Sequence, residues 1–212
     1  MFTEKSIEDC LNEIEFDPNN VINIKHFDDY IESTKLLGDP EFMSPIVLSG
    51  IMHDHYNEVH EQILKGECFE VKYKPRLTLN FFIDDIYFLL DKAYMFLKNP
   101  QYRTDHRGFS FFSELFTNII EWGNNSKNDK FEFHVRTSPK GSLIVINQEN
   151  EWDYKKVVKI FQEGGSITSR EGSGGCGMWC MNRNPYEVGY TDNGKKTYVI
   201  ITKDTFDKSS KS

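Results

Sequence analysis

The sequence has no excess of positive charge and few cysteines, and both shortages exclude classes of protein. Among its 212 residues, 33 are Asp or Glu and 25 are Lys or Arg, which gives a formal net charge of -8. A broad basic face for nucleic acid is therefore not expected. The four cysteines are expected to be free cytosolic thiols. Cys176 and Cys180 lack a nearby His or third Cys, so a zinc site is not expected.

The sequence also lacks an uninterrupted apolar run long enough for a membrane helix. Its most apolar window, LTLNFFIDDIYFLLDKAYMFL, contains Asp84, Asp85 and Asp91, which predicts a core helix and no membrane span. Residues 1–20 are acidic and lack an apolar run, so no cleavable signal is expected. We therefore expect a cytoplasmic protein.

The pattern changes from helical to mixed at residue 67. Before it, three segments have helical character: IEDCLNEI, HFDDYIESTKLL and IVLSGIMHDHYNEVHEQILKG. We therefore predict a helical extension over residues 1–66 that serves dimerisation or partner binding. The main domain is expected over residues 67–205, and a disordered tail over residues 206–212.

The main domain is predicted to combine strands and helices in an α+β two-layer sandwich with a mostly antiparallel sheet. The strand CFEVKYK is predicted from its alternation. FEFHVRTS and SLIVIN, joined by Pro-Lys-Gly, form one predicted hairpin, and EVGYTD and KTYVIITK, joined at Asn193-Gly194, form another. Helices are predicted near residues 79–98, 111–125 and 153–162.

The predicted helix FFSELFTNIIEWGNN places Glu114 and Asn118 one turn apart on one face. This polar line could simply face water. However, a solvated stripe usually contains Lys or Arg, and this helix has neither. Magnesium prefers hard oxygen ligands such as an Asn carbonyl and phosphate oxygens. A carboxylate one turn away can orient and deprotonate a water or a hydroxyl.

ELFTNIIEWG resembles the asparagine box of the GHKL ATPases, nearest to anti-sigma factor serine kinases and sensor histidine kinases. Further segments match that family in order. KIFQEGG is similar to the phenylalanine box, GSGGCGMW to the second glycine box, and KKTYVIIT to the terminal strand under the adenine. The resemblance covers about residues 67–203, and four motifs in the right order are more specific than any one alone.

The resemblance implies a GHKL (Bergerat) fold that binds ATP with Mg²⁺ and acts on a protein partner. Glu114 would be the general base, Asn118 would hold magnesium, and Thr197 would lie under the adenine. The residues implied around the phosphates are Gly172, Gly174, Gly175 and Gly177. Glycines allow the backbone to approach an anion closely, and a helix that starts near Met178 would direct its free N–H groups at a phosphate. A flexible surface loop is the alternative.

The first glycine box of the family, D-x-G-x-G, is altered here to NQENEWD. Asn147 stands at the Asp position that accepts from the adenine amino group, and an Asn carbonyl can still accept. Glu149 and Glu151 replace the glycines, and Asp153 is an alternative adenine partner if the loop is longer. Three hypotheses follow: an ATP-dependent kinase or ATPase, a degenerate domain that works as a non-enzymatic interaction or inhibitor module, and a site for another purine.

The extension contains HDHYN, which resembles the H-D-x-x-N phosphoacceptor of some sensor kinases, with His53 as the acceptor. A polar helix that happens to contain histidines is the alternative. GHKL proteins often dimerise, so the resemblance also implies a homodimer formed through this extension.

Overall fold

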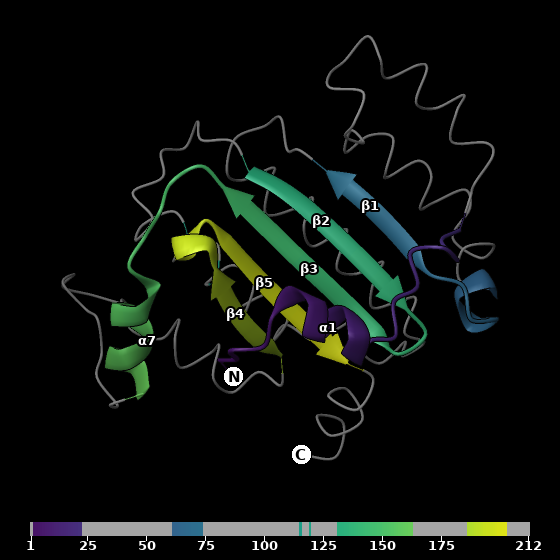
Figure 1. Ribbon diagram of the computed structural model, residues 1–212, viewed down its shortest axis with the longest axis horizontal. Coiled ribbons are helices and arrows are strands. Elements are labelled where there is room, and N and C mark those ends of the chain that lie inside the picture. Colours follow the sequence, from purple (N-terminus) through teal and green to yellow (C-terminus); the bar gives the residue numbers. More distant parts are fainter. Residues whose placement is uncertain are drawn as a thin grey trace, which may run out of the picture.

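The computed structural model describes residues 2–22, 61–73, 115, 119, 131–162 and 186–202 of the chain. Its centre is a five-stranded antiparallel sheet with the order β1-β2-β3-β5-β4 (Figure 1). The strands are β1 (Phe69–Tyr73), β2 (Phe131–Ser138), β3 (Gly141–Gln148), β4 (Glu187–Thr191) and β5 (Lys196–Thr202). The helices whose bounds lie within the described residues are α1 (Ile7–Glu13), α7 (Tyr154–Gln162) and the 3₁₀ helix η2 (Asp192–Gly194). The predicted α+β arrangement with an antiparallel sheet is confirmed.

Both predicted hairpins are present, and each turn has a local cause. Strands β2 and β3 are joined by Pro139 and Lys140, with Ser138 opposite Gly141. Strands β4 and β5 are joined through η2, where Asp192, Asn193 and Gly194 have φ angles of 56°, 53° and 84°. Asp, Asn and Gly are the residues that tolerate this left-handed region best.

The register divides the sheet into two faces. On the face that α1 covers, which we call the α1 face, Cys10 and Ile14 pack against Leu143, Val145 and Tyr198. The other face, here the inner face, carries the side chains of the alternate positions. Its members on the two central strands are buried: Ser142, Ile144, Ile146, Gln148, Thr197, Val199 and Ile201. Strand β3 is therefore buried on both sides, which explains its nearly continuous apolar sequence.

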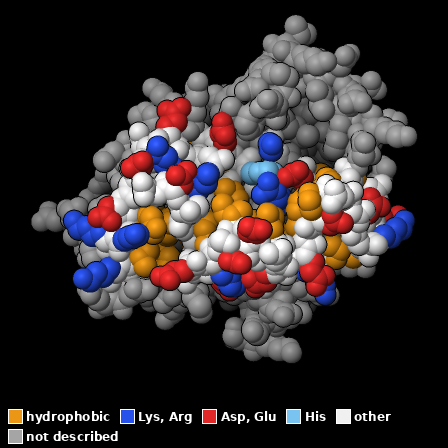
Figure 2. All heavy atoms as spheres, in the orientation of Figure 1, with side chains coloured by type: hydrophobic (Ala, Val, Ile, Leu, Met, Phe, Trp, Pro, Cys, Tyr) orange, Lys and Arg blue, Asp and Glu red, His pale blue; other side chains and the backbone are white. Residues whose placement is uncertain are grey.

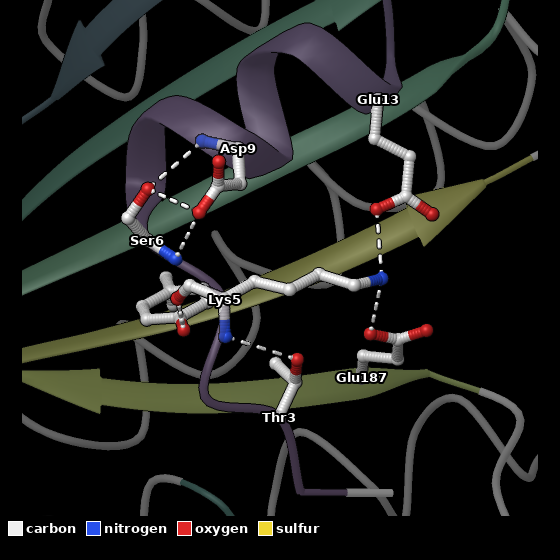
Figure 3. Close-up of polar contacts among 7 residues, drawn as sticks. Thr3, Lys5, Ser6, Asp9, Glu13 and Glu187 are labelled. Atoms are coloured by element: carbon white, nitrogen blue, oxygen red, sulfur yellow. Dashed lines mark hydrogen bonds and ion pairs between the residues drawn. The ribbon is translucent and has the colours of Figure 1, made fainter.

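The N-terminal segment is held on the α1 face by local and long-range contacts. Ser6 and Asp9 form a capping box that starts α1 (Figure 3). Lys5 Nζ lies 2.8 Å from Glu13 Oε2 and 2.9 Å from Glu187 Oε2. Burial opposes the charge of Lys5, but these two carboxylates raise its pKa above the ordinary value. Helix α1 therefore belongs to the packing of the sheet.

This segment reaches both edges of the sheet through two isolated parallel bridges. Phe2 pairs with Val188 on edge strand β4, and Val21 pairs with Cys68 next to edge strand β1. The boundary predicted between residues 66 and 67 therefore does not separate residues 2–22 from the sheet. The remainder of the predicted extension up to residue 60 lies outside the described residues.

Two described residues come from the predicted helix over residues 111–125. Leu115 and Ile119 are both helical and both 0% exposed, as expected for the apolar side of that helix. Cys10 and Cys68 are free thiols, as predicted, and both are buried. Within the described ranges, no helix has the length and apolarity needed to span a membrane.

Candidate functional site

Two of the predicted site residues, Asn147 and Thr197, belong to the described part of the chain, and both lie near the carboxyl end of β3. The others lie outside the described residues: His53, Glu114, Asn118, Gly172, Gly174, Gly175 and Gly177. The site is therefore built from the end of β3, the loop that follows it, η2 and the start of β5. Figure 1 shows that these segments meet at one end of the sheet, next to the connection to α7.

The register places Asn147 and Thr197 on opposite faces of the sheet. Asn147 is opposite Lys196, whereas Thr197 is opposite Ile146. Directly opposed residues share a face and successive residues alternate, so Asn147 lies on the α1 face and Thr197 on the inner face. The structure therefore does not bring these two predicted adenine contacts together.

Gln148 is the polar residue at the carboxyl end of β3 that shares the inner face with Thr197. Its backbone N–H donates to the carbonyl of Lys195 at 2.9 Å, which makes Thr197 its diagonal neighbour at about 7–8 Å. Its side-chain Nε2 donates to the carbonyls of Asn150 at 3.0 Å and Gly194 at 2.8 Å. Because both amide protons are used, the orientation of the amide is fixed. Gln148 Oε1 is buried and has no hydrogen-bond partner among the described residues.

Thr197 provides a second buried oxygen without a partner on the inner face, and Asn147 Oδ1 on the α1 face also lacks one among the described residues. The residue is 0% exposed, and its Oγ1 has no hydrogen-bond partner among the described residues. Its cross-strand neighbours on the inner face are Ile146 and Tyr190. Leaving a buried polar group unpaired costs about 1–3 kcal/mol. Native structures rarely retain such groups without a reason, so Gln148 Oε1 and Thr197 Oγ1 identify the candidate ligand-binding position.

An aromatic cluster borders this position. The Trp152 ring contacts the Tyr190 ring edge to face, with centroids 5.3 Å apart, and Tyr154 stacks on Tyr190 at 5.0 Å. Phe2 adds a ring 6.0 Å from Tyr190. Burial raises the pKa of the Tyr190 hydroxyl, so it stays neutral. Trp152 is 7% exposed, and its Nε1 also lacks a hydrogen-bond partner among the described residues.

The acidic residues of the loop after β3 lie at the surface. Glu149, Glu151 and Asp153 are all exposed. Glu151 pairs with Lys195, with 3.5 Å between Oε1 and Nζ. Asp153 Oδ1 accepts from the backbone N–H of Lys156 at 3.2 Å, in the first turn of α7. Asp153 therefore acts as a helix cap, which argues against its role as an adenine partner.

A second polar cluster, absent from the sequence predictions, lies on the α1 face near β1. Glu70 Oε1 accepts from Arg136 Nε at 2.7 Å and lies 2.5 Å from His134 Nε2. Burial alone would raise the pKa of Glu70, but hydrogen bonds from Arg136 and His134 lower it. The pKa of His134 is lowered by burial and by the charge of Arg136. Figure 2 shows basic, acidic and histidine side chains gathered beside apolar groups on this side.

The inner-face position has hydrogen-bonding groups suited to a planar polar ligand. Gln148 Oε1 can only accept, Trp152 Nε1 can only donate, and the Thr197 hydroxyl can do either. No group of metal-ligating side chains occurs among the residues that the structure describes. Gln148 and Trp152 were not among the residues predicted for this site from the sequence, although the polar Gln148 at the end of an apolar strand was a visible signal.

Comparison with known proteins adds no relative from which a function could be transferred. No protein family model matches this sequence, and no curated protein matches it significantly. Support for a function therefore comes from the residues of the chain.

Proposed function

We propose that this chain is an ATP- and Mg²⁺-binding regulatory protein of the histidine kinase-like ATPase type, acting on a protein partner. One observation carries the proposal. Gln148 Oε1 and Thr197 Oγ1 are buried, lie on the same face of the sheet, and lack hydrogen-bond partners among the described residues. A bound ligand would supply those hydrogen bonds and offset a cost of about 1–3 kcal/mol for each group.

Adenine has the chemistry that this position requires. Its amino group can donate to Gln148 Oε1, whose direction is fixed by the amide contacts to Asn150 and Gly194. The Thr197 hydroxyl can donate to a ring nitrogen of the base. Ile146 and Tyr190 flank Thr197 on the same face and offer apolar surface to the flat ring. Gln148 thus replaces Asn147 as the proposed partner of the adenine amino group.

The remaining parts of the proposal depend on the sequence resemblance. Asn118 would hold the magnesium ion, and Glu114 would orient and deprotonate a water or a hydroxyl. The four predicted glycines from Gly172 to Gly177 would surround the phosphates through backbone N–H groups. The magnesium ion would neutralise phosphate charge when bound.

A degenerate domain that acts as a non-enzymatic interaction or inhibitor module is the second candidate. It is favoured by the loop after β3, which has no glycine and carries exposed Glu149, Glu151 and Asp153 next to the expected ligand. Negative charge at that position opposes a triphosphate. The ion pair between Glu151 and Lys195 offsets part of it, although the pairing of exposed groups contributes only weakly.

Calorimetric titration with ATP, with and without magnesium, tests the two candidates. We expect heat of binding for the wild-type chain, and for Asn118→Ala at least a tenfold loss of affinity that appears only when magnesium is present. Pull-downs of the protein partner with and without ATP complete the test. No heat at millimolar ATP, together with a stable protein complex that ignores nucleotide, would favour the interaction module.

A further inference from the structure

The indole of Trp152 carries a buried donor whose lack of a partner needs a physical explanation. The residue is 7% exposed, and Nε1–H makes no hydrogen bond with any described residue. A buried indole N–H usually finds an acceptor, because leaving it unpaired costs about 1–3 kcal/mol. Trp152 also lies in the loop where the sequence departs from the family pattern, so no family motif assigns it a role.

Contacts with Gly194 place the indole beside Gln148. The backbone N–H of Trp152 donates to the carbonyl of Asn193 at 3.2 Å, which fixes the loop against η2. A Cβ at Gly194 would lie 2.5 Å from Trp152 Cδ1 and 2.9 Å from Nε1, so this edge of the indole lies directly over Gly194. The carbonyl of the same glycine accepts from Gln148 Nε2 at 2.8 Å. Trp152 and Gln148 therefore both contact Gly194.

Contacts with Tyr190 link the indole to Thr197 through one shared neighbour. The Trp152 and Tyr190 rings meet at an interplanar angle of 87°. Tyr190 is the direct cross-strand neighbour of Thr197, so the two share the inner face. Three buried polar atoms without partners among the described residues thus belong to residues that share the neighbours Gly194 and Tyr190: Gln148, Trp152 and Thr197. A fourth such atom, Asn147 Oδ1, belongs to the α1 face.

We propose that Trp152 is a ligand-contacting specificity residue whose Nε1–H donates to a ring nitrogen of the bound base. This inference rests on the proposed function, because the base is the adenine whose amino group donates to Gln148 Oε1. A 6-aminopurine carries an amino donor next to a ring-nitrogen acceptor on each of two edges. Gln148 Oε1 accepts from the amino group, and Trp152 Nε1–H donates to the neighbouring ring nitrogen. A 6-oxopurine presents an acceptor to Gln148 Oε1 and is therefore disfavoured.

Deaza analogues of ATP combined with Trp152→Phe test this hydrogen bond. Calorimetry would compare ATP, 1-deaza-ATP and 7-deaza-ATP on both proteins. A hydrogen bond of this kind is worth about tenfold in affinity. We expect the wild-type chain to lose about tenfold in affinity for the analogue that lacks the nitrogen accepting from Trp152. Trp152→Phe should bind ATP about tenfold more weakly than the wild type does. The variant should bind that analogue no more weakly than it binds ATP.

The outcomes separate this inference from the function on which it rests. No ATP binding by the wild-type chain overturns both. Normal ATP affinity in a folded Trp152→Phe overturns the role of Trp152 alone. Equal wild-type affinity for all three nucleotides overturns the ring-nitrogen contacts proposed for Trp152 and Thr197 and leaves ATP binding intact.

A second measurement covers the case in which Trp152→Phe does not fold. The chain has three tryptophans, so the Nε1–H resonance of Trp152 can be assigned by elimination in Trp122→Phe and Trp179→Phe. We expect saturating ATP to move that resonance downfield and to slow its exchange with solvent. A resonance that does not respond to bound ATP would also overturn the inference.

Discussion

The side-chain amide of Gln148 donates to the carbonyl oxygen of Gly194 at 2.8 Å, and this contact determines the direction of the Gln148 oxygen. A flipped amide would place Oε1 against the carbonyls of Gly194 and Asn150, and three acceptors would then face one another. The oxygen is therefore held as an acceptor, as the proposed contact with the base requires. Such preorganisation reduces the cost of binding.

Alanine variants of neighbouring residues distinguish the two candidates for the adenine contact. Gln148→Ala removes two hydrogen bonds to carbonyls and the acceptor, so we expect about 2 kcal/mol lower free energy of unfolding and at least tenfold weaker ATP binding. Asn147→Ala changes the opposite face of the sheet and should leave ATP affinity unchanged. Urea denaturation and calorimetry provide both numbers. If Asn147→Ala weakens binding and Gln148→Ala does not, Asn147 is the adenine partner.

Thr197→Val should stabilise the protein while weakening its ligand binding. Valine has nearly the same shape and removes a buried hydroxyl that has no partner among the described residues. We expect the free energy of unfolding to rise by up to about 1 kcal/mol and ATP affinity to fall about tenfold. Thermal melts and calorimetry measure the two effects.

Thr137→Val is the matched control for that substitution. Thr137 is also buried on the inner face, but its Oγ1 lies 2.9 Å from Ser142 Oγ. Its valine variant should leave the Ser142 hydroxyl unpaired, lower stability by about 1–2 kcal/mol and keep ATP affinity. Equal destabilisation by both variants would show that the Thr197 hydroxyl has a structural role.

Acidification should destabilise the fold through His134 and then Glu70. The pKa of His134 is lowered from 6.5 by burial and by Arg136, so the unfolded chain takes up the proton at higher pH than the folded one. Stability should therefore be complete above pH 6.5 and decrease as the pH falls through that value. The lowered pKa of Glu70 adds a second loss as the pH falls through 4.5 and below.

His134→Gln isolates the first of these two windows. Glutamine cannot titrate, so the free energy of unfolding of the variant should change less between pH 7 and pH 5 than that of the wild type. Denaturant titrations at several pH values measure the slope. A variant with the wild-type slope would assign the loss to other groups.

Local structure was largely predictable from the sequence because its causes are local. The alternation in FEFHVRTS, the turn residues Pro139 and Asn193, and the polar start of α1 each act within a few neighbouring residues. For this reason all five strands and helices α1 and α7 agree with the predicted segments within about two residues. The buried positions Leu115 and Ile119 agree with the predicted periodicity of their helix.

The composition of the candidate site was harder to predict because it depends on register. Side chains alternate between faces with every residue, so a shift of one position exchanges Asn147 for Gln148 as the neighbour of Thr197. The segment NQENEWD lacks the glycines of the D-x-G-x-G motif with which it was compared. Without them, the comparison does not decide whether Asn147 or Gln148 stands at the position of the Asp. Trp152 reaches the site through η2 and Tyr190, and these contacts join segments about 40 residues apart in the chain.

The sequence by itself determined the strands, their hairpin turns and the acidic character of the chain, because each depends on neighbouring residues or on composition. Only the tertiary structure decided that α1 closes one face of the sheet, that Gln148 and Thr197 share the other, and that Trp152 packs against Gly194 and Tyr190. The physical reason is that strand pairing sets which face each side chain occupies, and strand pairing is a contact between distant parts of the chain.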